Sequence, residues 1–369
     1  EDFPKLFKVK ADFDVEVPHD ERQERQYARF VAKLCREEAL PPFGADAVAE
    51  VIRQSFRFAD RHDRLSLRFS LVSDLIREAG YWARKDSHSF VTRADVESAL
   101  AHQRRRADLP EQWIQDEIKE GTLMVDLQGE VVGQVNGLSV YQLGDYSFGR
   151  PTRITARTYV GTKGVIDIQR EVELAGHIHS KGVLTLAGFL AGTFAGLQPF
   201  ALSATLTFEQ TYSEIEGDSA AVAELTAVLS SLATLPVRQS LAVTGSVNQL
   251  GEIQPIGGVN EKIEGFFESC KRRGLTGTQG VVIPARNTKH LALNREVVAA
   301  VEEGTFAVYG VDTIEQALEL LIGVRAGERG PDGTYPPESI YGRTAARLEE
   351  LAQIVASWGE AEEHAQVND

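Results

Sequence analysis

The chain has 369 residues, which is enough for two or three domains that each bury a core. It is 43% hydrophobic and 25% charged, as is typical of globular proteins, and its net charge of −15 argues against nucleic-acid binding through a basic face. The longest apolar stretch, residues 182–194, is broken by glycines and too short to cross a membrane. We therefore expect neither a nucleic-acid nor a membrane partner.

The two cysteines, Cys35 and Cys270, lie far apart in the sequence, each on the apolar side of a predicted helix. This pattern predicts buried, reduced thiols and a cytoplasmic protein. The sequence has no CxxC motif and no cluster of cysteine and histidine, so we expect no metal site.

The N-terminal residues 3–13 predict a strand that is already under way, and the chain begins at Glu1 rather than at methionine. We therefore expect a piece of a longer protein. No signal-peptide pattern is present.

Residues 20 to about 107 predict a helical block. Pro41-Pro42 separates its first two helices, and Thr92 caps a fourth helix that ends in the basic run Arg104-Arg105-Arg106. We interpret this run as a solvated helix end that complements the helix dipole, with a docking patch as the alternative. Apolar residues recur at helical spacing in three segments: Tyr27, Phe30, Val31 and Leu34; Val48, Val51, Ile52 and Phe56; and Phe69, Val72, Leu75 and Ile76.

Beyond residue 120 the pattern changes to strands, and then to strands alternating with helices, which predicts an α+β fold. Valine, glycine and threonine dominate residues 121–170, with a turn at Gln128-Gly129. The elements expected after that are a helix over 181–194, a strand over 200–209 with one solvated face, a helix from Ser219, a hairpin of 241–247 with 251–256, a helix from Val259, strands over 280–283 and 306–309, a helix capped by Asp312 with Glu315 three residues later, and one weak helix over roughly the last twenty-five residues.

Ser219 is a candidate nucleophile because it follows a glycine turn and stands at the predicted start of an apolar helix. Backbone N–H groups at a helix start are unpaired and stabilise a developing oxyanion. The alternative is structural, since Asp218 and Ser219 are also ordinary helix-capping residues.

A serine nucleophile needs a base. His177, His179 and His290 are candidates for a Ser-His-Asp triad, but the G-x-S-x-G elbow is absent and no spacing singles out one of them. Lys262 is the other candidate, because it lies on a helix with an apolar stripe, and apolar surroundings lower the pKa of a lysine.

Three linked motifs carry a family resemblance: Glu216-Gly-Asp-Ser-Ala, Val243-Thr-Gly-Ser-Val, and Pro255-Ile-Gly-Gly-Val-Asn-Glu-Lys-Ile. On these motifs, and on the 43 positions from Ser219 to Lys262 (262 − 219), the sequence resembles the Lon protease family, in particular a Lon-related branch with Glu-Gly-Asp-Ser-Ala around its serine. The resemblance covers roughly residues 120–325, and more weakly the helical block. It implies an N-terminal helical AAA+ lid-like domain followed by an α/β Lon proteolytic domain.

The resemblance implies a serine endopeptidase in which Ser219 attacks the scissile carbonyl and Lys262 is the base. Thr244 would hydrogen-bond the lysine, and the N–H of Ser219 with a neighbouring N–H would form the oxyanion hole. Glu216 is placed near the dyad with its role open, because an ionised carboxylate would raise the pKa of Lys262. Asp218 is either a supporting residue or only a cap.

The implied domains are the end of a truncated nucleotide-binding domain (1–19), the helical lid-like domain (20–107), the proteolytic domain (108–325) and a C-terminal extension (326–369). Arg68 is a candidate sensor arginine of the lid. No G-x-x-x-x-G-K-[ST] motif and no acidic Walker B strand is present. We therefore expect no cofactor in this chain, and ATP with Mg²⁺ only if the full-length protein has an intact ATPase module.

The implied partners are unfolded or loosely folded protein substrates and further copies of the chain in a hexameric ring. Three rival interpretations stay open at this point. One is a catalytically silent Lon-like chaperone or scaffold module, against which the intact Ser219, Thr244 and Lys262 argue. The second is a small-molecule kinase-like enzyme, against which the lack of a phosphate-binding glycine loop argues. The third is a histidine-dependent serine hydrolase.

Overall fold

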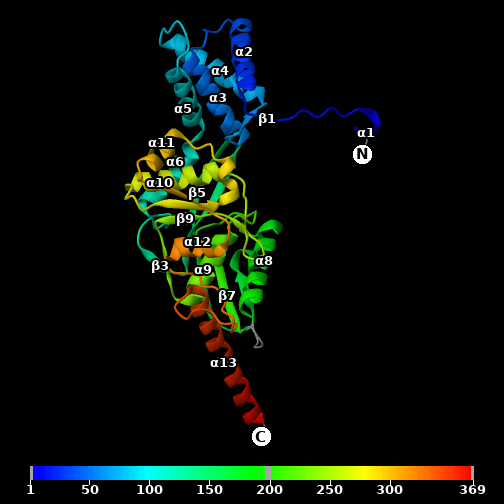
Figure 1. Cartoon of the computed structure of the whole chain (residues 1–369), viewed down its shortest axis with the longest axis vertical. Helices are drawn as coiled ribbons and strands as arrows, with labels where there is room; N and C mark the ends of the chain where they lie inside the picture. Colours follow the sequence, from blue (N-terminus) through cyan, green and yellow to red (C-terminus); the bar gives the residue numbers. More distant parts are fainter. Residues whose placement is uncertain (1–2, 196–200, 367–369) are drawn as a thin grey trace. The chain divides into compact units, whose positions relative to one another are not determined.

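The computed structural model describes residues 3–195 and 201–366, and these form two compact units (Figure 1). The first unit comprises Glu1–Pro110 with Lys289–Leu293, and the second comprises Glu111–Thr288 with Asn294–Asp369. Among the described residues, no helix combines the length and the apolar character that crossing a bilayer requires.

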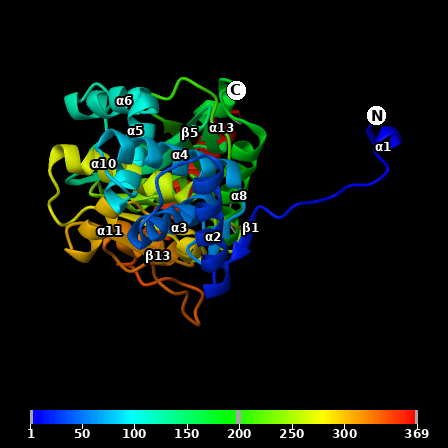
Figure 2. The same cartoon turned by 90° about the horizontal axis from the view of Figure 1, so that it is seen from above.

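The first unit is a helical bundle, as the sequence predicts, and its helices lie side by side in Figures 1 and 2. The predicted apolar stripes converge on one core that includes Tyr27, Val51 and Leu75. Thr92 caps the last helix of the bundle, and its backbone N–H donates to the Asp95 carboxylate at 2.8 Å. The bundle helices are α2 (Glu21–Glu37), α3 (Ala45–Ala59), α4 (Phe69–Lys85) and α5 (Arg93–Ala107).

The strand predicted over residues 3–13 is wrong. The structure has a short helix α1 (Phe3–Leu6) there, and the first strand, β1 (Glu16–Pro18), pairs antiparallel with β2 (Arg64–Ser66). A strand needs a neighbour for its N–H and C=O groups, and among the described residues 3–14 none pairs with another strand. Phe13 illustrates the result, because 89% of its surface is exposed.

A seven-stranded mixed sheet organises the second unit, in the order β13-β12-β9-β4-β5-β7-β6. The neighbours β4, β5 and β7 are antiparallel, whereas β9, β12 and β13 continue the sheet beyond β4 in parallel. The strands are β4 (Gln134–Leu143), β5 (Tyr146–Val160), β6 (Gly164–Asp167), β7 (Leu202–Phe208), β9 (Leu241–Val243), β12 (Gly280–Pro284) and β13 (Ala307–Val311). The predicted order, a helical domain followed by an α/β domain, is confirmed.

Two short antiparallel ribbons accompany this sheet: β3 (Glu130–Val132) with β8 (Pro236–Arg238), and β10 (Ser246–Val247) with β11 (Ile253–Gln254). The predicted hairpin is therefore only partly correct. Its outer half is β10 with β11, but its first residues form β9, which is buried and pairs with β4 and β12 in the large sheet. Phe200, placed in the predicted strand over 200–209, lies outside the described residues, and Ser203 in β7 is buried rather than solvated.

The helices of the second unit cover the sheet, and the central one, α9, is buried along almost its whole length. The last helix has about the predicted length but begins at Ile340, and it is anchored by Ile340, Tyr341, Leu348 and Leu351, which join the core around α9. The helices are α6 (Leu109–Glu120), α7 (Ile168–Glu171), α8 (His177–Phe194), α9 (Ala221–Ala233), α10 (Val259–Arg273), the 3₁₀ helix η1 (Ala285–His290), α11 (Arg295–Glu302), α12 (Ile314–Ile322) and α13 (Ile340–Gln366).

Two local predictions need correction. Helix α9 begins at Ala221, so Ser219 lies before the helix rather than in its first turn. The N-cap of α12 is Thr313 rather than Asp312, whose backbone N–H bonds the side chain of Gln316. Helices α6 and α11 were not anticipated. The start of α10 at Val259 is confirmed, and both cysteines are buried free thiols.

Candidate active site

Ser219 lies in a tight turn between the loop after β7 and the start of α9. Gly217 begins this turn with φ of 90°, a conformation that favours glycine. The N–H of Ala221 closes the turn on the carbonyl of Asp218 at 3.1 Å. In the part of the chain that the structure describes, the N–H groups of Ser219 and Ala220 have no acceptor. Two backbone donors next to the hydroxyl are thus available to a ligand oxygen.

The turn is attached to the residues that follow β9. The carbonyl oxygen of Ser219 accepts the N–H of Gly245 at 2.8 Å and the hydroxyl of Thr244 at 3.1 Å. These two bonds direct the Ser219 carbonyl away from α9. They are the physical reason why the helix starts later than its apolar pattern predicts.

Lys262 lies in the first turns of α10, and this helix packs so closely against β5 that the two backbones are in contact. A Cβ on Gly149 would come within 2.1 Å of the Glu261 carbonyl oxygen, and a Cβ on Gly265 within 1.9 Å of the Gly149 carbonyl oxygen. Only glycine permits so close an approach of helix to strand. This contact leaves Lys262 3% exposed beside the Ser219 turn.

The structure brings Ser219, Lys262 and Thr244 together. The Nζ atom of Lys262 is 2.8 Å from Ser219 Oγ and 3.1 Å from Thr244 Oγ1. Burial disfavours the ammonium form and lowers the pKa of Lys262 to about 8, although the charges of Asp218 and Glu261 oppose the change. A substantial fraction of this lysine is therefore neutral just above neutral pH, and a neutral amine beside a hydroxyl is able to accept its proton.

Glu216 and Asp218, the two carboxylates that the sequence places near the dyad, make different contacts. Asp218 accepts the hydroxyl of Ser246 at 2.9 Å, and its charge, with that of Glu261, is the one that acts on Lys262. Glu216 lines the same groove as Ser219 and Lys262, and its carboxylate accepts the backbone N–H of Ile178 at 3.3 Å, at the start of α8. Ser246 and Glu261 both lie inside the quoted motifs, but neither was among the candidate site residues.

A groove runs past Ser219 and Lys262. Its walls are the second half of β4 and the loop before α9. Strand β4 pairs with β5 over its whole length but with β9 only at Asn136 and Gly137, so residues 138–142 have one strand neighbour. The lining residues are Leu138, Ser139, Val140, Tyr141, Gln142, Thr152, Phe208, Thr211, Ser213–Gly217, Ser219, Ala220, Gly257, Gly258 and Lys262. This shape suits an extended peptide that adds a strand along β4.

The histidines considered as alternative bases lie elsewhere. His177 is exposed at the start of α8, and His179 is buried with its Nε2 3.0 Å from Asp167 Oδ2. His290 belongs to the first unit. Among the described residues, the side chain that hydrogen-bonds Ser219 Oγ is that of Lys262.

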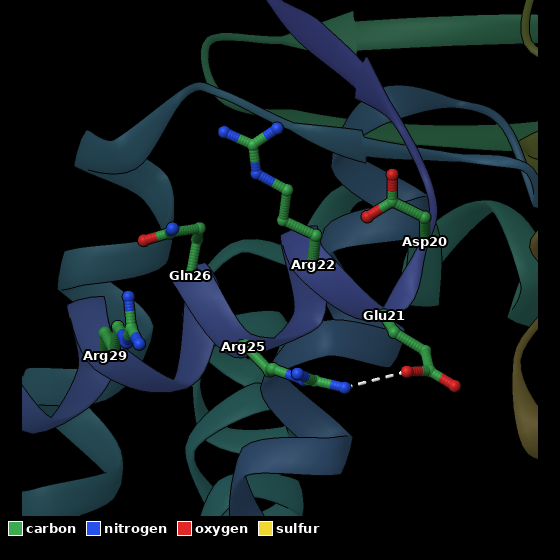
Figure 3. A pocket seen from close by; sticks show the side chains of 6 residues that line it. All are labelled: Asp20, Glu21, Arg22, Arg25, Gln26 and Arg29. Atoms are coloured by element: carbon green, nitrogen blue, oxygen red, sulfur yellow. Dashed lines mark hydrogen bonds and ion pairs between the residues drawn. The ribbon is translucent and has the colours of Figure 1, made fainter.

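A second hollow lies on α2 in the first unit and is lined by polar and charged side chains, with Arg25 paired to Glu21 (Figure 3). Its lining residues are Asp20, Glu21, Arg22, Arg25, Gln26 and Arg29. None of these side chains is a hydroxyl or thiol nucleophile, so this hollow offers no site for acyl transfer.

Comparisons with known proteins agree with the two-unit organisation. Residues 213–323 match the Lon protease (S16) C-terminal proteolytic domain, and residues 42–106 match the archaeal LonB AAA+ ATPase LID domain. A protein described as a Lon protease homolog in Escherichia coli strain K12 is 41% identical over 300 residues, which cover 80% of this chain and 50% of that protein. The archaeal Lon protease of Thermococcus kodakarensis is 31% identical over 312 residues, covering 83% of this chain and 46% of that protein. The chain thus spans about half the length of these curated relatives.

Proposed function

The chain belongs to the Lon protease family, and from this premise we propose that it is a serine endopeptidase with Ser219 as nucleophile and Lys262 as general base. The observation that carries the proposal is the 2.8 Å contact between Lys262 Nζ and Ser219 Oγ. The burial that lowers the pKa of this lysine to about 8 supports its use as a base.

In the first step, neutral Lys262 takes the proton of Ser219 while Oγ attacks the carbonyl carbon of the scissile peptide bond. The carbonyl oxygen becomes an oxyanion, which the N–H groups of Ser219 and Ala220 stabilise. Thr244 accepts a hydrogen bond from Nζ and keeps the amine directed at Oγ. The ammonium of Lys262 then donates its proton to the leaving nitrogen, the C–N bond breaks, and an ester on Ser219 remains.

In the second step a water molecule attacks the ester carbonyl and gives a proton to Lys262. The Ser219 oxygen leaves and recovers a proton from the ammonium, which restores the starting state. Asp218 and Glu261 hold negative charge near Lys262. We propose that they stabilise the ammonium transiently, at the cost of a smaller neutral fraction in the resting enzyme. For Glu216 we propose a supporting role at the start of α8, where its contact lies.

We propose that the substrates are unfolded or loosely folded polypeptides. The open edge of β4 offers hydrogen bonds to an extended backbone, and a folded domain has to open before its backbone can enter the groove. Opening a stable domain costs about 5–15 kcal/mol. We also propose that six chains assemble into a ring, as the family resemblance implies, which light scattering of the purified protein tests.

A fluorogenic peptide assay tests the proposed function. Ser219→Ala and Lys262→Met each abolish cleavage, and Lys262→Arg does so too because a guanidinium stays protonated near neutrality. The matched control is Lys271→Met, since Lys271 lies on the same helix but is exposed and paired with Glu296. Cleavage that survives in Ser219→Ala, or that is lost equally in Lys271→Met, contradicts the assignment.

A further inference from the structure

Three ionisable side chains with no part in the proposed chemistry meet in the interior of the second unit. They are Asp167 at the end of β6, His179 on α8 and Glu224 on α9, and each is at most 2% exposed. His179 Nε2 lies 3.0 Å from Asp167 Oδ2 and 3.7 Å from Glu224 Oε1. Burying such groups is costly unless they satisfy one another.

The cluster is connected to the Ser219 turn from both sides. Before the turn, Ile215 exchanges backbone hydrogen bonds with Leu174 and Gly176, just ahead of α8, each at 2.8 Å. After the turn, the N–H of Glu224 donates to the carbonyl of Ala220 at 3.0 Å. The segment that carries Ser219 is therefore held between α8 and α9, which are the two helices that His179 and Glu224 join.

The cluster also touches the groove. The ring of His179 packs edge-on against Phe208 with the ring centroids 5.3 Å apart, and Phe208 lines the groove. A change in the position of His179 is thus transmitted to a groove wall as well as to α8.

The protonation state of Glu224 determines how the three side chains are arranged. Its Oε1 atom has no hydrogen-bond partner among the described residues. An unpartnered buried oxygen is tolerable in a neutral carboxyl but costly in a carboxylate. Burial raises the pKa of Glu224 to about 7, with the positive charge of His179 opposing and the negative charge of Asp167 assisting.

His179 faces the acidic groups of three elements: Asp167 from the end of β6, Glu224 from α9, and Glu216 from the loop before Ser219. Burial alone would lower the pKa of His179, but the hydrogen bond to Asp167 and these three negative charges outweigh burial and raise it. With an imidazolium, one carboxylate and one neutral carboxyl, the cluster has no net charge. Ionised Glu224 would need a donor, and His179 Nε2, which lies 3.7 Å from its Oε1, already bonds Asp167.

We infer that Asp167, His179 and Glu224 form a proton-sensitive clamp that positions the Ser219 turn between α8 and α9. The inference rests on the proposed function, because its main readout is peptide cleavage. Glu224 is a positioning residue: its neutral form holds the arrangement described here, whereas its ionised form competes with Asp167 for His179, moves α9 relative to α8 and lowers kcat. KM changes less, because most of the groove is unaffected.

The test compares kcat across pH for wild type, Glu224→Gln and the control Glu296→Gln, an exposed carboxylate on α11. Glutamine stays neutral at every pH, so we expect Glu224→Gln and wild type to have equal kcat near pH 6. At pH 9 we expect the kcat of Glu224→Gln to be at least about tenfold above that of wild type, because a group with a pKa of about 7 is ionised there in wild type. We expect the kcat of the control Glu296→Gln to depend on pH in the same way as that of wild type. Superimposable profiles of wild type and Glu224→Gln overturn the inference.

A second measurement does not depend on catalysis. Infrared spectroscopy of wild type reports a protonated buried carboxyl that disappears on raising the pH through neutrality and is absent from Glu224→Gln. Over the same pH range, amide hydrogen exchange at Ser219–Val222 accelerates in wild type relative to the variant. If no variant cleaves peptide but both signals appear, the proposed function fails and the clamp stands. An ionised Glu224 at pH 6, or unchanged relative exchange, refutes the clamp.

Discussion

Lys262 should destabilise the protein in which it acts, and replacing it by methionine tests this directly. A lysine in water has a pKa of 10.5, and in the folded chain burial lowers the pKa of Lys262 to about 8. At 1.36 kcal/mol per pKa unit, this difference corresponds to about 3 kcal/mol that the folded state loses by holding the ammonium at neutral pH. Methionine fills similar space and carries no charge.

The net gain is smaller because the ammonium also makes two hydrogen bonds. Its contacts with Ser219 Oγ and Thr244 Oγ1 each stabilise by about 1 kcal/mol. We therefore expect Lys262→Met to be about 1–2 kcal/mol more stable than wild type at pH 7. Urea unfolding followed by circular dichroism measures the difference.

The pH dependence identifies the cause. A depressed lysine pKa means that the folded state releases its proton first, so the stability of wild type rises with pH from about 8 towards 10.5. Between pH 7 and pH 9 the advantage of Lys262→Met over wild type should shrink by about 1.3 kcal/mol. Other titrating groups affect both proteins equally. An advantage that stays constant across this range would show that Lys262 has an ordinary pKa and would refute the reasoning.

Three further variants test the site. Thr244→Val removes one of the two acceptors of Lys262 Nζ and should lower kcat about tenfold with little change in KM, measured by steady-state kinetics. Asp218→Asn removes a charge that raises the pKa of Lys262, so the acid limb of the rate profile should move to lower pH; an unmoved limb contradicts this. Gly265→Ala forces a Cβ against the Gly149 carbonyl and should cost about 3 kcal/mol of unfolding free energy, whereas Gly192→Ala, with open space around it, should cost nothing.

Local patterns predicted the elements well. The helices of the first unit and the start of α10 at Val259 follow from apolar periodicity, prolines and caps, which act within a few residues. The strand order could not be predicted, because the insertion of β9 between β4 and β12 depends on pairing between distant segments. The strand predicted over residues 3–13 is wrong for a related reason, since the sequence of a segment does not reveal whether a pairing partner exists.

The candidate site likewise contains features that follow from local sequence and features that depend on contacts between distant segments. Motif spacing led to Ser219, Thr244 and Lys262, which the structure brings within hydrogen-bond distance; their catalytic roles remain predictions. Glu216 lines the groove beside the dyad, but its contact with the start of α8 could not be predicted, because the orientation of a loop side chain depends on what lies across from it. Glu224 was not among the candidate residues, because a single glutamate on an apolar helix does not indicate which residues it contacts in the fold.

The central claim is that Ser219 forms a covalent bond with the substrate when Lys262 removes its proton. The most direct measurement is to incubate the protein with a peptide ester whose acyl-enzyme hydrolyses slowly, and to locate the acyl group by mass spectrometry of a proteolytic digest. We predict an adduct on Ser219 in wild type, none in Ser219→Ala, and much slower formation in Lys262→Met with formation unchanged in Lys271→Met. An acyl group on another residue, or peptide cleavage without any adduct on Ser219, would contradict the account.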